Sequence, residues 1–164
     1  MSNVYTRNRK KTPFDVLANA EKLQDLVTLY VMNERYVPKK WRFMIGQDLI
    51  KKIDELNDNI IAANSIYAMN DQDLANRKAY AQKAIANGYQ LQRKLSRLIR
   101  CVPSATAASL EEITSLLSQE IDDLKGWRKN DKIRAQTLPG GRCLHGAEFV
   151  RVLRVSYPLY YAAN

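Results

Sequence analysis

The stretch IGQDLIKKIDELNDNI, residues 45 to 60, carries an apolar side chain at every third or fourth position. These apolar residues are Ile45, Leu49, Ile53, Leu56 and Ile60. Because an α-helix completes a turn every 3.6 residues or so, this spacing puts all of these side chains on one face of a helix. We expect the helix to begin at Pro38 and to end near Tyr67, with its apolar face buried.

Three further segments show the same apolar spacing, which predicts four helices in all. The first runs from Pro13, behind an N-cap at Thr12, to about Asn33. The third follows a cap at Asn70 or Asp71 and ends before a loop rich in Ser, Ala and Thr. Each of these helices has one apolar face to bury.

The fourth helix is expected to begin at a capping box, Ser109-Leu110-Glu111-Glu112, and to end near Trp127. Four amphipathic helices joined by short loops bury their apolar faces most simply as an antiparallel up-down bundle. The sequence therefore predicts an all-α fold in three parts. These parts are a basic N-terminal arm over residues 1–12, the four-helix bundle over 13–130, and a C-terminal tail over 131–164.

The composition of the tail differs from that of the helices. The segment LPGGRCLHG, residues 138 to 146, contains helix-breaking residues, and FVRVLRVSY, residues 149 to 157, is rich in strand-forming residues. Three arrangements fit this pattern: a hairpin, a strand added to the sheet edge of a partner, and a mobile segment. The sequence does not choose among them.

The chain has the composition of a soluble, reduced protein. No apolar run approaches the roughly 20 residues that span a bilayer, so a membrane protein is not expected. Asp15 and Glu21 interrupt what would be the apolar part of a signal peptide, which predicts a cytoplasmic location. Cys101 and Cys143 are far apart in the sequence, so we expect free thiols and neither a disulfide framework nor a zinc site.

Positive charge is concentrated in particular segments of the chain, which has a formal net charge of +9. The helix expected from residue 71 onward contains no acidic residue between Arg77 and Arg100. Bases also gather in the N-terminal arm, at the start of the second helix and at the end of the fourth. The candidate nucleic-acid-binding residues are Arg7, Arg9, Lys10, Lys11, Lys39, Lys40, Arg42, Lys83, Arg93, Lys94, Arg97, Arg100, Arg128 and Lys129.

The bases of the third helix fall opposite its leucine stripe, so they are expected to face outward. Like charges three or four residues apart, as at Arg93, Arg97 and Arg100, repel one another by a few tenths of a kcal/mol per pair. A polyphosphate backbone compensates this repulsion and releases its counterions, which favours RNA or DNA as the ligand. The alternative is a solvated face that pairs with the acidic residues of the fourth helix, in the same chain or in a neighbouring subunit.

The residues needed for most enzyme sites are missing. His145 is the one histidine of the chain and lies in the tail, so neither a Glu-x-x-His metal pair in the bundle nor a Ser/His/Asp triad is expected. There is no Walker loop and no GxGxxG motif. The sequence predicts a protein without a catalytic site, a metal or a cofactor.

Aromatic residues accompany the basic segments. They either stack on unpaired bases or pack within the bundle and its subunit interfaces. The residues concerned are Trp41, Phe43, Tyr80, Tyr89 and Trp127. Gly46 and Gly88 lie inside predicted helices, where glycine costs up to about 1 kcal/mol relative to alanine, so we expect close helix packing at both.

Two segments carry a family resemblance. VPKKWRFMIGQDLIKKIDEL, residues 37 to 56, resembles the Pro-Lys-x-x-Arg-[Phe/Tyr]-x-[Leu/Ile]-Gly opening of the second helix in one four-helix-bundle family. That family contains proteins encoded in intervening sequences of bacterial large-subunit ribosomal RNA genes, and the accessory variability determinant (Avd) of diversity-generating retroelements. LLSQEIDDLKGWRK, residues 116 to 129, is similar to the Avd branch, whose last helix typically ends in Gly-Trp.

The resemblance implies a non-catalytic bundle that assembles as a homopentamer, binds RNA and DNA through a basic surface, and contacts the reverse transcriptase of the retroelement. With its template RNA, that complex makes mutagenic complementary DNA. The matching positions are Pro38, Lys39, Arg42, Gly46, Gly126 and Trp127. The tail is longer and the arm more basic than in the family pattern. The alternative function is an oligomeric helix-bundle protein whose basic face docks an acidic protein partner.

Overall fold

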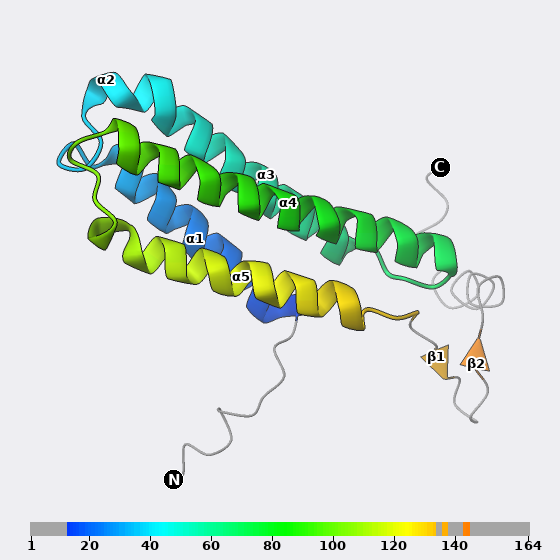
Figure 1. Cartoon of the computed structure of the whole chain (residues 1–164). Helices are drawn as coiled ribbons and strands as arrows, with labels where there is room; N and C mark the ends of the chain where they lie inside the picture. Colours follow the sequence, from blue (N-terminus) through cyan, green and yellow to red (C-terminus); the bar gives the residue numbers. More distant parts are fainter. Residues whose placement is uncertain (1–12, 134–135, 138–142, 145–164) are drawn as a thin grey trace, which may run out of the picture.

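The computed structural model describes residues 13–133, 136–137 and 143–144, and it confirms the all-α prediction (Figure 1). Four long α-helices account for most of the described chain. In chain order the elements are α1 (Pro13–Met32), α2 (Lys39–Trp41), the π-helical turn η1 (Arg42–Gly46), α3 (Gln47–Ser65), α4 (Asp71–Cys101), the 3₁₀ turn η2 (Ala108–Leu110), α5 (Glu111–Asn130), β1 (Gln136–Thr137) and β2 (Cys143–Leu144).

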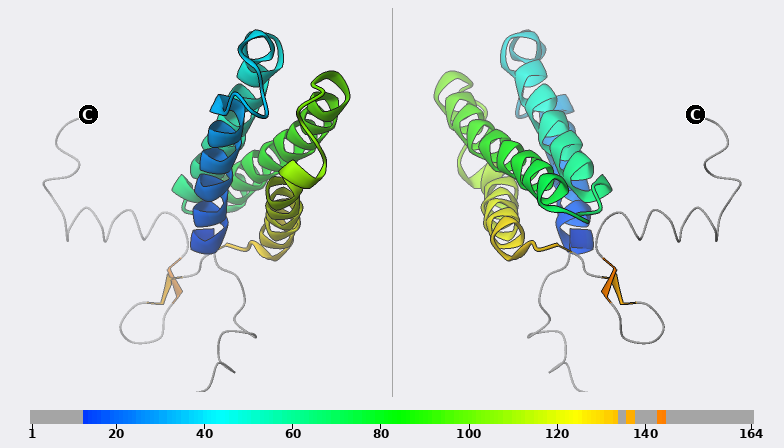
Figure 2. Two further views of the ribbon diagram at one scale, coloured as in Figure 1. Left: turned by 90° about the vertical axis from the view of Figure 1, so that its left-hand side faces the viewer. Right: turned by 90° about the vertical axis from the view of Figure 1, so that its right-hand side faces the viewer.

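The long helices lie side by side, and each packs against two of the others (Figures 1 and 2). α1 contacts α3 and α5, and α4 contacts the same two helices. α1 and α4 are therefore diagonal to each other, so their outer faces point away from one another. Successive helices run in opposite directions, with the α4–α5 connection beside α2 at one end, called here the α2 end.

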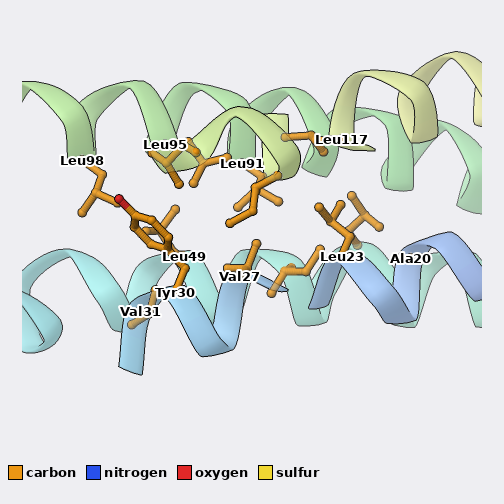
Figure 3. Packing of buried hydrophobic residues seen from close by; sticks show 14 of the residues in the cluster. Ala20, Leu23, Val27, Tyr30, Val31, Leu49, Leu91, Leu95, Leu98 and Leu117 are labelled. Carbon is orange, nitrogen blue, oxygen red and sulfur yellow. The ribbon is translucent and has the colours of Figure 1, made fainter. Parts of the chain in front are cut away.

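A single apolar core fills the space among the long helices (Figure 3). Leu49, Ile53, Leu56 and Ile60 of α3 are fully buried and Ile45 nearly so, which confirms the apolar face predicted for this stretch. Burying each such side chain contributes about 1.5–3 kcal/mol to folding. Leu23 of α1, Leu91 and Leu95 of α4, and Leu117 of α5 meet them from the other helices.

The second predicted helix is interrupted by a change of helical type. Its first turn is α2, followed by the π-helical η1, whose last hydrogen bond runs from the amide of Gln47 to the carbonyl of Arg42. α3 then continues to Ser65, two residues short of the expected end at Tyr67. Asn70 is the N-cap of α4, as predicted, and its side chain accepts a hydrogen bond from the amide of Asp73.

The capping box predicted at Ser109–Glu112 is wrong, because the box forms three residues earlier. The amide of Ser109 donates to Thr106 Oγ1 at 3.2 Å, and the amide of Thr106 donates to Ser109 Oγ at 3.2 Å. This reciprocal pair begins η2, which leads directly into α5. The Ser109 hydroxyl also donates to the carbonyl of Thr106 and lies 2.8 Å from the Tyr30 hydroxyl, while α5 has Leu110 at its N-cap position and no side-chain cap. The cap predicted at Thr12 lies outside the described residues.

A buried ion pair holds the end of the molecule opposite α2. Arg77 is 1% exposed, and its Nε lies 3.0 Å from Oδ2 of Asp131. The same guanidinium donates to the carbonyl of Ile66 at 3.1 Å and lies 5.2 Å from the centre of the Trp127 ring. Asp131, the first residue of the expected tail, is therefore attached to the bundle.

Part of the tail forms a hairpin. β1 and β2 pair antiparallel, with Gln136 opposite Leu144 and Thr137 opposite Cys143. The strand-like segment 149–157 lies outside the described residues. In the part of the chain that the structure describes, no helix is long and apolar enough to cross a bilayer.

Gly46 and Gly88 both lie where helices come close together. A Cβ atom added to Gly88 would be 2.8 Å from Ile121 Cγ1 and 3.6 Å from Leu56 Cδ1. At Gly46 it would be 2.7 Å from Val31 Cγ1. Real Cβ atoms essentially never lie within 3.0 Å of such atoms, and the distances to Ile121 and Val31 are both shorter than that. The prediction of close helix approach is therefore confirmed at both positions.

We expect Gly88→Ala to lower the free energy of unfolding by about 1–2 kcal/mol, because overpacking against Ile121 outweighs the gain in helix propensity. Gly126→Ala is the matched control, since among the described residues no atom outside the local helix backbone and the adjacent residues lies within 4 Å of the added Cβ. It should raise stability by up to about 1 kcal/mol. Urea unfolding measures both changes, and a stabilised Gly88→Ala protein would contradict the close packing.

Candidate nucleic-acid interface

The outer face of α4 carries the largest group of candidate residues. Arg93, Arg97 and Arg100 are exposed there, as is Lys83 further toward the start of the helix. Arg93, Lys94, Arg97 and Arg100 line an open hollow of about 390 Å³ together with Gln90. Within the described residues, Arg93, Arg97 and Arg100 take part in no ion pair. Their charges are therefore available to a ligand.

Lys94 differs from the arginines beside it, because it is half-buried and paired. Its Nζ lies 2.8 Å from Oδ2 of Asp48 on α3. The hydrogen bond and the charge of Lys94 lower the pKa of the Asp48 carboxyl, and the charges of Arg97 and Lys51 lower it further. Asp48 therefore partly neutralises Lys94.

Two lysines of α3 extend this boundary. Lys51 is exposed, and Lys52 is ion-paired with Glu55. The hydrogen bond from Lys52 lowers the pKa of Glu55, with smaller contributions from the charges of Lys52, Lys51 and Lys94. Lys51 and Lys52 were not among the predicted site residues. Lys51 and Lys52 follow Asp48 by three and four residues, so they lie beside it on the surface of α3. Their position next to the bases of α4 depends on the packing of α3 against α4.

The other border of the α4 face is formed by α5. Lys125 pairs with Asp122 at 2.9 Å and lies 5.4 Å from the centre of the Tyr89 ring. Its hydrogen bond with Tyr89, followed by that with Asp122, raises the pKa of Lys125. Arg128 hydrogen-bonds to Gln82 of α4. Arg128 thus lies beside α4, where it can extend the basic face.

Two more predicted bases lie near this face. Lys129 is exposed on the last turn of α5. Lys83 lies 4.8 Å from the centre of the Tyr80 ring, so its ammonium is partly held by a cation–π contact. Arg77, which the sequence groups with the bases of the third helix, is buried and structural.

The bases at the start of the second helix have a different setting. Lys39 and Lys40 are exposed at the α2 end, and Lys40 lies 5.5 Å from the centre of the Trp41 ring. Arg42 is only partly exposed; its Nε donates to the carbonyl of Val37 at 3.1 Å and its Nη2 lies 3.6 Å from Glu34. These contacts hold the turn before α2, so the structure gives Arg42 a local role. Arg7, Arg9, Lys10 and Lys11 lie outside the described residues.

The candidate stacking residues differ in how far their rings are buried. Trp41 and Trp127 are half-buried and pack on the core, as does Tyr36, whose ring stacks on Tyr30 at 4.8 Å. Phe43 and Tyr89 remain exposed, at 68% and 48%. Tyr89 alone of these two lies on α4 beside the basic residues.

Exposed apolar side chains gather at the α2 end, around the last turns of α1 and the turn η1. Leu29, Met32, Phe43 and Met44 are each exposed by more than half. Met32 and Phe43 line a hollow of about 250 Å³ together with Val31, Lys39, Arg42, Gln47 and Ile50. We call Leu29, Met32, Phe43 and Met44 the apolar patch. Of these residues the sequence singled out Phe43 alone, because Leu and Met side chains are also typical of a buried core.

Among the described residues, no group of three or more His, Cys, Asp or Glu side chains is placed to hold a metal ion. Comparison with protein-family models, curated proteins and solved structures finds no match to this chain.

Proposed function

We propose that the chain is a non-catalytic, nucleic-acid-binding scaffold. The observation that carries the proposal is the outer face of α4, where Arg93, Arg97 and Arg100 are exposed without carboxylate partners in the described chain. A phosphate backbone relieves the repulsion among these charges and releases condensed counterions. The test is fluorescence anisotropy with a labelled single-stranded RNA, in which the affinity should fall steeply as the salt concentration rises.

The more specific form of the proposal is an Avd-type accessory protein in the cytoplasm. Here the chain is an antiparallel up-down bundle that partners the reverse transcriptase of a diversity-generating retroelement during mutagenic, template-RNA-primed cDNA synthesis. Support comes from the segment Pro38–Gly46, in which Arg42 holds the preceding turn and Gly46 permits contact with Val31. Affinity-tagged chain should retain a reverse transcriptase from the cells that produce it. Retention of an acidic protein instead would favour the alternative function.

The scaffold is proposed to self-associate, as a homopentamer, through the apolar patch. Soluble monomers rarely leave large apolar side chains grouped on one surface. The patch includes Leu29 and Met32 on the outer side of α1, which is diagonal to α4. Association through the patch would therefore leave the basic faces of all subunits accessible.

We expect the double variant Met32→Gln/Phe43→Gln to weaken self-association at least tenfold while the helices stay folded, because both side chains are largely exposed. Light scattering at micromolar concentration should report a lower mass than for the wild-type chain. Ile61→Gln, which changes an exposed residue of α3 outside the patch, is the matched control and should keep the wild-type mass. A monomeric wild-type chain would contradict the proposal.

Asp48→Asn should strengthen nucleic-acid binding, since it removes the carboxylate that neutralises Lys94. If Lys94 then contacts one more phosphate of a single strand, the slope of log K against log salt becomes steeper by about 0.7. Near 0.1 M salt this corresponds to about fivefold tighter binding. Asp25→Asn on the diagonal helix α1 is the control for net charge, and an equal gain there would contradict a local effect of Lys94.

A further inference from the structure

Tyr89 is an unusual residue on the outer face of α4. It is 48% exposed in the middle of a 31-residue helix, next to Gly88, which is buried against Ile121. Its neighbour one turn later is Arg93, the first of the exposed arginines. An exposed aromatic ring gains little from folding, so its position beside the basic residues calls for another explanation.

The setting of the ring suits contact with a flat, unpaired base. The Lys125 ammonium lies 5.4 Å from the ring centre, and nearly half of the Tyr89 surface remains open. Lys125 is itself 44% exposed, so it can turn toward a phosphate without being uncovered first. Lys125 of α5 therefore lies near the ring, and the exposed Arg93 follows Tyr89 by one turn of α4.

We propose that Tyr89 is a stacking platform for a base, so that the basic face of α4 prefers single-stranded over double-stranded nucleic acid. Tyr89 and Arg93 are four residues apart, about 6 Å along the helix axis. A backbone phosphate held by Arg93 thus leaves its base, or the next one, within reach of the ring. In a duplex the bases are already stacked and paired, so the ring has nothing to add. This inference rests on the proposed nucleic-acid function.

The test compares wild type, Tyr89→Ala and Tyr89→Phe on a 12-nucleotide single-stranded RNA, the matching duplex, and heparin, a polyanion without bases. Stacking on one base predicts that Tyr89→Ala weakens single-strand binding about tenfold and leaves the salt slope unchanged. Binding of the duplex and of heparin should stay at the wild-type value. Tyr89→Phe should bind like wild type, which excludes a role limited to the hydrogen bond with Lys125.

The outcomes separate this inference from the function on which it rests. Equal single-strand affinity for wild type and Tyr89→Ala, or an equal loss on all three ligands, would overturn the stacking role, while binding by the wild-type chain would still support the nucleic-acid function. A wild-type chain that binds none of the three ligands would overturn both. Circular dichroism checks the fold, which Tyr89→Ala should preserve because the side chain is exposed and alanine favours helix.

Discussion

Changing Arg93, Lys94, Arg97 and Arg100 together to glutamine is expected to weaken binding of single-stranded RNA about 100-fold near 0.1 M salt. Arg93, Arg97 and Arg100 are free to contact phosphates, whereas Lys94 is held by Asp48. Three phosphate contacts correspond to about 0.7 × 3, or roughly 2 units, in the slope of log K against log salt. Glutamine keeps the length and the helix propensity of the replaced residues, so α4 should remain folded.

The loss should be nearly the same for RNAs of different sequence, because phosphate contacts carry no base information. Anisotropy titrations at several salt concentrations measure both the affinity and the slope. A suitable control changes Lys22, Arg35 and Lys132 to glutamine, which removes three exposed charges that lie outside α4 and are not candidate site residues. If both variants lose the same affinity, net charge rather than the α4 face determines binding.

Asp131→Ala is expected to lower the free energy of unfolding by about 3 kcal/mol, since it removes a carboxylate that lies 3.0 Å from Nε of the buried Arg77. Asp122→Ala removes the same side chain from an exposed ion pair with Lys125 and should cost about 0.5 kcal/mol or less. Urea unfolding compares the two variants directly.

Replacing Arg77 by methionine in the Asp131→Ala chain should restore part of the lost stability, because the buried guanidinium that faced Asp131 is then removed as well. If the Asp131→Ala and Asp122→Ala proteins unfold at the same urea concentration, the Arg77–Asp131 ion pair does not hold the end of α5. In that case the folded bundle would end at residue 130, as the sequence predicts.

Local patterns predicted the helices and the outward direction of their charges, because both depend on helical period. The period also explains η1 in retrospect. Trp41, Ile45, Leu49 and Ile53 recur in steps of four, which exceeds the 3.6 residues of an α-helical turn. The wider π-helical turn absorbs the excess and keeps these side chains on the buried side.

Interactions between distant residues were not predictable in the same way. Asp131 is 54 positions from Arg77, and Asp48 is 46 positions from Lys94, so only tertiary packing pairs them. The shift of the capping box has a similar cause, since the distant Tyr30 hydroxyl contacts Ser109. Arg77, a base of the third helix that was not a candidate, and the candidate Arg42 accordingly have structural roles, whereas Lys51 of α3 joins the candidate site.

The most direct test of the nucleic-acid interface is photo-cross-linking of a single-stranded RNA containing 4-thiouridine, followed by trypsin digestion and mass spectrometry. We predict that cross-links fall in the peptide AIANGYQLQR, residues 84 to 93, which carries Tyr89 and ends at Arg93. The peptide LQDLVTLYVMNER, residues 23 to 35, lies mostly on α1, the helix diagonal to α4, and serves as the internal comparison. Cross-links in that peptide, with none in residues 84 to 93, would contradict the assignment of the α4 face as the binding surface.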